Sequence, residues 1–337
     1  MIHFGNDYNE TAHPAVLSAL AVPGSHAGYG LDEHSARAAS LIRNACAAPA
    51  ADMHFMVGGT QANTTAIVSI LRPWQGVISA DTGHINTHET GSVEHAGHKI
   101  LALPSALGKI TAAQVAALVE EYRGSGVLEH AVEPAMVYIS QPTEYGTVYS
   151  HSELAALRSV CDEFGLTLFV DGARLGYGLA ASDVTLPDLA RLADVFTIGG
   201  TKCGAAFGEA IVFATPHPYF RNAMKQNSGL LAKGWLLGAQ FEALFTDSLY
   251  EAITAHANEQ AQRIAAAFAS VGIRLLFDSP TNQQFALLTP EQEAALSEDY
   301  VCQFFEEHDG LRAVRFCTSW STRDEDVDAL CASIAQL

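Results

Sequence analysis

Two short apolar segments, each followed at once by charged residues, constrain the fold of this chain most strongly. The segment LTLFV (166–170) leads into Asp171 and Arg174, and DVFTIGG (194–200) leads into Thr201 and Lys202. Apolar runs of this length, bounded by glycine, are typical of parallel strands that are buried on both faces of a sheet. Because ligands of open α/β sheets bind at the carboxyl ends of the strands, we expect Asp171 and Lys202 to lie in a site.

The rest of the chain alternates in the same way. Further apolar strands are predicted at 52–57, 76–80, 135–140 and 209–214, with helices between them that include 111–122 and a helix capped by Ser150 and Glu153. This order favours an α/β fold with a mostly parallel sheet. From about residue 250, a long alanine-rich helix precedes strands at 272–277, 283–289 and 313–318 and a last helix. We therefore predict an N-terminal arm (1–20), a large α/β domain (21–249) and a small C-terminal α+β domain (250–337).

Composition excludes several classes of partner. The chain has 337 residues and a formal net charge of −19, which disfavours nucleic acid and anionic membrane surfaces. Six cysteines are scattered without paired spacing, as expected for reduced thiols in the cytoplasm, and the histidines show no metal-ligand spacing, so no metal site is predicted. The N-terminus lacks the features of a signal peptide, and no apolar run has the length of a membrane span.

The pairing of Asp171 with Lys202 indicates a cofactor, pyridoxal 5'-phosphate. This cofactor needs a lysine for a Schiff base and a carboxylate beside its pyridine nitrogen. The chain has five lysines, and Lys202 is the one that follows an apolar strand and a Gly-Gly turn. Taken separately, the two residues could be a surface lysine and a helix cap, but Arg174 three residues after Asp171 makes a shared site the better interpretation.

Two further segments fit such a site. The residues Gly58, Gly59 and Thr60 lie between a predicted strand and a helix, where free backbone N–H groups and the helix dipole favour a phosphate group. His84 follows the strand at 76–80 and precedes Glu89 by five residues. An imidazole at that place can stack on an aromatic ring or move protons, although a structural histidine is an equally good interpretation.

Together, DGARL (171–175), Lys202, the turn GTQAN (59–63), the His84/Glu89 pair, AVRF (313–316) and the AGYG loop (27–30) resemble the threonine aldolases. This family belongs to the β-eliminating lyase branch of the fold-type I, aspartate-aminotransferase-like pyridoxal-phosphate enzymes. The resemblance covers nearly the whole chain. It implies that Asp171 pairs with the pyridine nitrogen and that His84 stacks on the ring.

The resemblance also implies substrate contacts. Arg174 and Arg315 would bind the substrate carboxylate, and Tyr29 and Asn6 would lie near the substrate. Lys233 is the expected substitute for a phosphate-binding arginine that this family takes from a neighbouring subunit. Glu144 stands where many members have a second active-site histidine, which leaves open the base that handles the β-hydroxyl.

The resulting expectation is aldol cleavage of a β-hydroxy-α-amino acid, such as L-threonine, L-allo-threonine or phenylserine, to glycine and an aldehyde. Lys202, His84, Asp171 and Glu89 are the predicted catalytic residues. Two alternatives stay open: a β-eliminating lyase or dehydratase that uses the same cofactor, and a non-catalytic carrier of the cofactor. The resemblance implies a homodimer or homotetramer with active sites at the subunit interface.

Overall fold

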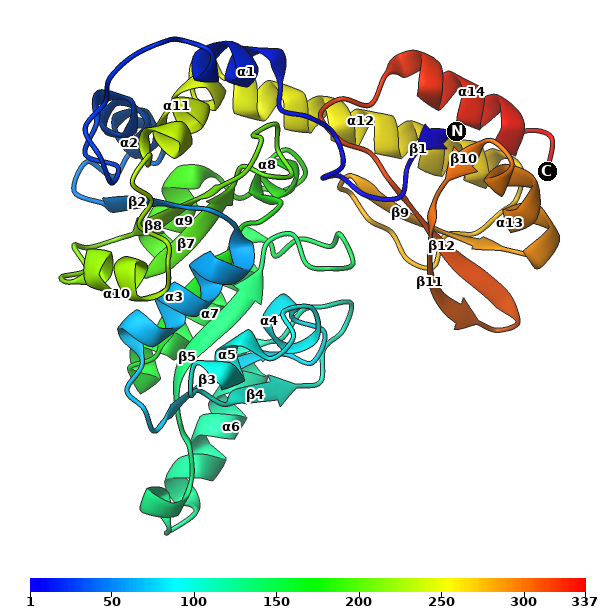
Figure 1. Cartoon of the computed structure of the whole chain (residues 1–337). Helices are drawn as coiled ribbons and strands as arrows, with labels where there is room; N and C mark the ends of the chain where they lie inside the picture. The colour runs from blue at the N-terminus through cyan, green and yellow to red at the C-terminus, as the bar shows by residue number, and fades with distance from the viewer.

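The computed structural model describes residues 1–337 and shows two lobes joined by one long helix, α12 (Leu249–Ser270) (Figure 1). The larger lobe is built on a seven-stranded sheet with the order β2-β8-β7-β6-β5-β3-β4. Its strands are β2 (Asp52–Met56), β3 (Gln75–Ala80), β4 (Ile100–Leu103), β5 (Glu133–Ser140), β6 (Thr167–Asp171), β7 (Val195–Gly199) and β8 (Glu209–Phe213). Strand β8 runs antiparallel to both of its neighbours, and the other paired strands are parallel. The predicted mostly parallel sheet is confirmed.

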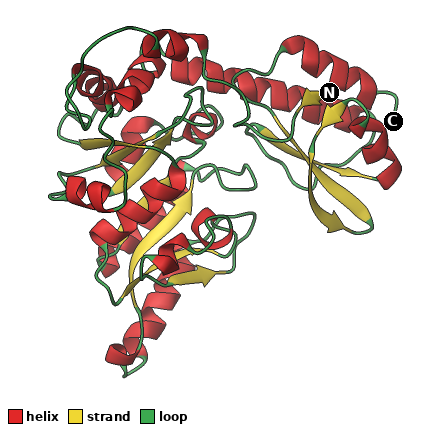
Figure 2. Cartoon of the chain, viewed as in Figure 1, coloured by secondary structure: helices red, strands yellow, loops and turns green.

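Helices cover both faces of this sheet (Figure 2). They are α1 (Pro14–Leu20), α2 (Glu33–Ala45), α3 (Gly59–Ile70), α4 (His84–Thr87), α5 (Ser92–His95), α6 (Ala112–Gly124), α7 (His151–Phe164), α8 (Leu175–Leu179), α9 (Leu186–Leu192), α10 (Phe220–Gln226) and α11 (Trp235–Leu244). One apolar cluster joins the sheet to helices that include α6, α7 and α9, and a second joins it to α3, α5 and α10. Val137 belongs to the first cluster and Tyr138 to the second, as expected for neighbours on a strand buried on both faces.

Local sequence signals set the helix ends. The predicted capping boxes at Thr111 and Ser150 are both formed, at the first turns of α6 and α7. Helix α7 ends at Gly165, which has the left-handed backbone conformation (φ 74°) that glycine adopts without strain. No helix combines the length and the apolar character that crossing a membrane would require.

The smaller lobe contains a three-stranded antiparallel sheet packed against helices. Its elements are β9 (Gln283–Leu288), α13 (Pro290–Ser297), β11 (Gln303–His308), β12 (Leu311–Cys317) and α14 (Asp324–Ile334). The strand expected at 272–277 is wrong, because the chain bends at Leu276 and Phe277 and only Leu275 forms a bridge, to Ala286. The N-terminal strand β1 (Ile2–His3) pairs with β10 (Tyr300–Val301), so the arm begins on the smaller lobe (Figure 1).

Candidate active site

Two glycines bring the loops after β6 and β7 into direct contact. A Cβ atom at Gly172 would lie 2.1 Å from the carbonyl oxygen of Thr197, and one at Gly199 would lie 2.2 Å from that of Ala173. The Gly199 N–H donates to the Gly172 carbonyl at 2.8 Å. Only residues without a side chain fit this approach, which brings the segment carrying Arg174 next to the segment carrying Lys202.

The Asp171 carboxylate ends β6 and is buried among hydrogen-bond donors. Its Oδ2 accepts from the Tyr138 hydroxyl at 2.5 Å and from Asn63 Nδ2 at 2.8 Å, and its Oδ1 accepts from the Ala173 N–H at 2.8 Å. Burial, followed by the negative charge of Asp171, raises the pKa of Tyr138, so this phenol remains a donor. The network fixes the orientation of the carboxylate from three sides.

His84 begins α4 and is held from behind by a buried carboxylate. Its Nδ1 lies 2.8 Å from Glu89 Oε1, which also accepts from Asn63 Nδ2 at 2.8 Å, while Glu89 Oε2 accepts from the Ser92 hydroxyl. Asn63 therefore links the Glu89 and Asp171 carboxylates through one amide group. This arrangement fixes the His84 ring and leaves its Nε2 without an intramolecular partner.

Four of the predicted site residues, His84, Asp171, Arg174 and Lys202, line one small pocket. The pocket is lined by His84, Ser140, Pro142, Thr143, Glu144, Asp171, Ala173, Arg174 and Lys202. Burial and the nearby Arg174 guanidinium lower the pKa of the Lys202 amine, while the Asp7 and Asp171 carboxylates oppose this shift. A lysine with a lowered pKa has a larger fraction of the neutral, nucleophilic amine at neutral pH.

Arg174 is held by a buried ion pair with the N-terminal arm. Its Nε and Nη2 donate to Asp7 at 2.6 and 2.9 Å, and Asn282 Nδ2 also donates to Asp7, at 2.9 Å. Burial is the largest single effect and would raise the pKa of Asp7. The charge and hydrogen bonds of Arg174, the charge of Lys202 and the Asn282 hydrogen bond together outweigh it and lower the pKa to about 2. Since guanidinium has five N–H donors, Arg174 keeps donors on Nη1 for an anion in the pocket.

The first turn of α3 leaves an open cradle of backbone N–H groups. A Cβ atom at either Gly58 or Gly59 would meet no atom within 4 Å, and the helix has no side-chain cap. Thr201 lies beside Lys202, and its hydroxyl accepts from the Gly208 N–H at 3.1 Å. The free N–H groups at a helix N-terminus, together with Lys202 and Asp171, fit the phosphate, the aldehyde carbon and the ring nitrogen of pyridoxal phosphate.

Arg315 and Asn6 lie where the N-terminal arm meets the smaller lobe. Arg315 donates to Gln283 at 2.9 Å and to the Gly5 carbonyl at 3.0 Å, and its buried Nε has no partner. Asn6 Oδ1 accepts from the backbone N–H of Tyr8 at 3.1 Å. Neither residue lines the pocket around Lys202. The charge of Arg315 nevertheless acts on His88 together with the charges of His84 and Lys202: burial lowers the pKa of His88, and these three charges lower it further.

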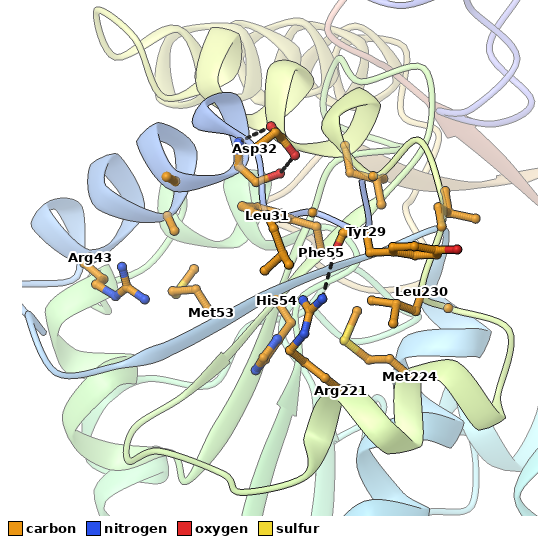
Figure 3. A pocket seen from close by; sticks show the side chains of 18 residues that line it. Tyr29, Leu31, Asp32, Arg43, Met53, His54, Phe55, Arg221, Met224 and Leu230 are labelled. Carbon is orange, nitrogen blue, oxygen red and sulfur yellow. Dashed lines mark hydrogen bonds between the residues drawn. The ribbon is translucent and has the colours of Figure 1, made fainter. Parts of the chain in front are cut away.

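Two predicted site residues lie elsewhere. Tyr29 lines a different and larger pocket, where Arg221 Nη2 donates to its carbonyl oxygen at 2.9 Å (Figure 3). The Lys225 amine lies 5.3 Å from the centre of the Tyr29 ring. Lys233 is exposed, in the loop before α11. Within one chain, the structure brings neither residue to the pocket of Lys202.

Sequence reasoning did not assign Tyr138, Asn63 or Glu209 to the site. Glu209 begins β8, is buried, and has one carboxyl oxygen without a partner. Burial and then the Asp171 charge raise its pKa, and Lys202 acts in the opposite direction. A charged residue at the start of the apolar strand EAIVF was the available signal, since an unpaired charge in a buried strand is costly.

The fold and this pocket define a pyridoxal-phosphate-dependent enzyme of fold type I. The chain belongs to the β-eliminating lyase family, whose model ("Beta-eliminating lyase") matches residues 14–291. It is 33% identical to a low specificity L-threonine aldolase of a Pseudomonas species, with 98% of this chain and 96% of that protein covered. The corresponding protein of Pseudomonas aeruginosa is 31% identical over the same shares.

Solved structures agree with this family. A threonine aldolase of Leishmania major superposes with a TM-score of 0.96 at 42% identity, covering 100% of this chain and 99% of that one. The aspartate aminotransferase of Thermus thermophilus has a TM-score of 0.72 at 15% identity, covering 100% and 91%, and shows the shared fold alone. The expected family, fold and cofactor are confirmed.

Proposed function

We propose that the protein cleaves β-hydroxy-α-amino acids between Cα and Cβ to give glycine and an aldehyde. The observation that carries this proposal is the convergence of Lys202, Asp171, Arg174 and His84 on one pocket. The low specificity L-threonine aldolases to which the chain is similar support the substrate class. Loss of any one of these side chains would remove a different part of the reaction.

Pyridoxal phosphate, when bound, supplies a conjugated ring that takes up the electron pair of the breaking bond. The Lys202 amine would attach the cofactor, and the backbone N–H groups at Gly58, Gly59 and Thr60 would bind its phosphate. The Asp171 carboxylate would accept a hydrogen bond from the protonated ring nitrogen and would thereby keep the ring electron-poor. Tyr138 and Asn63 hold that carboxylate in place.

Two arginines bind the carboxylate of the amino acid. Arg174 offers the donors on its Nη1, because Asp7 already occupies its Nε and Nη2. Arg315 lies beyond the lining of this pocket, and we assign its unpartnered Nε to the same carboxylate. Fixing the carboxylate fixes the rotation of the substrate about its Cα–N bond, which selects the bond at Cα that breaks. The β-hydroxyl must then give its proton to a group of the same pocket, where His84 and Glu144 are the available acceptors besides Lys202 and Asp171.

Product identification tests the proposal. Purified protein with added pyridoxal phosphate is incubated with L-threonine and with L-phenylserine. Glycine with acetaldehyde or benzaldehyde is the expected result. Ammonia with a 2-oxo acid would indicate β-elimination instead of aldol cleavage. The absence of any product despite bound cofactor would indicate a non-catalytic carrier of the cofactor.

We further propose that the enzyme is a cytoplasmic homo-oligomer, a dimer or tetramer, whose sites are shared between subunits. Tyr29 and Lys233, both assigned to the site from the sequence, lie outside the pocket of Lys202 within one chain, which supports a contribution from a second copy. All six cysteines are free, as expected in a reducing compartment. Sedimentation of the purified protein tests the assembly: a monomer at micromolar concentration would contradict it.

A further inference from the structure

The pocket contains a carboxyl group whose hydrogen bonding is incomplete. Glu144 lies in the turn after β5, and its Oε1 accepts from the Ser140 hydroxyl at 2.7 Å. Its Oε2 is shielded from solvent and has no partner. A buried oxygen without a donor is energetically costly, so a ligand that donates a hydrogen bond to Oε2 would be stabilised by removing that cost.

The turn that carries Glu144 is held rigidly. Thr143 N–H donates to the Thr147 carbonyl at 2.8 Å, and the side chain of Gln141 makes hydrogen bonds with both the N–H and the carbonyl of Tyr149. These bonds fix the backbone that carries Glu144, and the Ser140 hydrogen bond to Oε1 holds its carboxyl group. Its free oxygen is fixed in the pocket that also contains Lys202 and Arg174.

His84 is the other candidate for the residue that accepts the β-hydroxyl proton, and its hydrogen bonding differs from that of Glu144. Its ring is already oriented by Glu89, and its side chain is 30% exposed, so water can satisfy its second nitrogen. Glu144 Oε2 has no such access to water. Glu144, and not His84, therefore carries the acceptor atom that lacks a hydrogen-bond donor.

We propose that Glu144 is the base that accepts the β-hydroxyl proton of the substrate, with His84 as the residue that contacts the cofactor ring. This inference rests on the proposed function. The O–H bond of the substrate breaks and an O–H bond forms on Glu144 Oε2. The electrons of the O–H bond become the C=O bond of the aldehyde, and the electron pair of the Cα–Cβ bond remains at Cα, which later takes a proton to give glycine.

The electrostatics of the turn agree with such a role. Burial raises the pKa of Glu144 above its ordinary value of 4.5, and the Ser140 hydrogen bond opposes the shift. A base with a raised pKa receives a proton more readily. The titratable or charged groups that face it are His84, Asp171, Arg174, Lys202, Tyr138, Tyr145 and Tyr149.

The test compares Glu144→Gln with the wild type and with Glu163→Gln, the same change on the exposed face of α7. Two rates are measured: the cleavage of L-phenylserine, and the exchange of the α-hydrogen of glycine with D₂O, which needs the cofactor but no β-hydroxyl. For Glu144→Gln we expect kcat for cleavage to fall by about 10²–10⁴-fold, and the glycine exchange rate to stay within about threefold. The Glu163→Gln variant should match the wild type in both.

Three outcomes would overturn the inference. The first is cleavage by Glu144→Gln within about threefold of the wild type, and the second is an equal loss of cleavage and glycine exchange while cofactor absorbance and thermal unfolding stay unchanged. The third is a Glu144→Gln variant whose kcat/KM still falls at acidic pH as that of the wild type does.

If Glu144→Gln does not fold, Ser140→Ala replaces it. Removing the Ser140 donor should shift the fall of kcat/KM at acidic pH to a higher pH, and an unchanged pH profile would contradict the inference. A wild type that exchanges glycine but cleaves no β-hydroxy amino acid would instead contradict the proposed function.

Discussion

The Tyr138 hydroxyl donates a 2.5 Å hydrogen bond to Oδ2 of Asp171, linking strands β5 and β6 on the face covered by α3. The two residues come from different strands at the edge of the sheet where the pocket opens. Asn63 of α3 donates to the same oxygen. The position of the carboxylate is therefore set jointly by the sheet and by the helix whose first turn forms the phosphate cradle.

Tyr138→Phe removes one donor and leaves the ring and its packing in place. Since hydrogen bonds to charged groups contribute about 1.5–3 kcal/mol, we expect the free energy of unfolding of the cofactor-free protein to fall by that amount. Urea unfolding followed by circular dichroism measures it. Tyr122→Phe, on the partly exposed face of α6, is the matched control and should change stability by less than about 0.5 kcal/mol.

Asp7→Asn leaves the buried Arg174 charge without its partner. Breaking a buried pair in this way costs about 3–5 kcal/mol of unfolding free energy at neutral pH. The control is Asp162→Asn, which breaks a surface pair with Arg158 in which the Asp162 side chain is 67% exposed; it should cost about 0–1 kcal/mol. Equal losses for the two variants would contradict the structural role given to Asp7.

The same pair predicts a pH dependence. The pKa of Asp7 is about 2 in the folded protein and has an ordinary value of 3.8 in the unfolded chain. The unfolded state therefore takes up the proton first as pH falls, so the stabilisation is complete above about pH 4 and is lost as the pH approaches 2. The stability difference between wild type and Asp7→Asn should shrink over that interval, and a constant difference would refute the assignment.

Gly59→Ala tests the phosphate cradle. A methyl group there meets no protein atom within 4 Å, so we expect the free energy of unfolding of the cofactor-free protein to change by less than about 1 kcal/mol. The affinity for pyridoxal phosphate should fall at least tenfold, because the methyl group occupies the cradle. Gly124→Ala at the end of α6, which is equally open, should leave the affinity unchanged. Unaltered affinity in Gly59→Ala would place the phosphate elsewhere.

Glu89→Gln tests the support behind His84. The amide keeps the shape of the side chain, but one of its two terminal atoms becomes an NH2 group that cannot accept a hydrogen bond. It therefore cannot accept at both atoms, as Glu89 does from His84, Asn63 and Ser92. Glu89 is a positioning residue, so kcat should fall by about tenfold or more while KM for the amino acid changes less. Ser92→Ala removes one of the three contacts and should give a smaller loss. A change in KM alone would contradict this assignment.

Much of the fold could be predicted from the sequence because the large sheet is buried on both faces and its strands are continuous apolar runs. The capping boxes at Thr111 and Ser150 likewise depend on residues only three apart. The antiparallel direction of β8 was not predictable, since an apolar run is the same in either direction. The strand predicted at 272–277 was wrong for a related reason. The segment is apolar because it packs along β9, but it forms only one isolated bridge with that strand, at Leu275.

The site was predictable where motif and position coincide, as for Asp171 and Lys202 after their strands. Asn63 and Tyr138 could not be assigned because their roles depend on contacts to residues 108 and 33 positions away. The sequence placed Glu144 in the site but could not show that one of its oxygens lacks a donor. Tyr29 and Lys233 remain predictions whose test requires the assembled protein.

Attachment of the cofactor to Lys202 and aldol cleavage can be tested in one experiment. Wild type, Lys202→Ala and Lys99→Ala, an exposed lysine as control, are loaded with pyridoxal phosphate and incubated with L-phenylserine while glycine and benzaldehyde are quantified. A portion of each is reduced with borohydride and its cofactor-bearing peptide is identified by mass spectrometry. We predict equal amounts of glycine and benzaldehyde and a modified Lys202 peptide in the wild type and Lys99→Ala, and neither in Lys202→Ala. Full turnover or a retained adduct in Lys202→Ala would show that Lys202 is not the residue that attaches the cofactor.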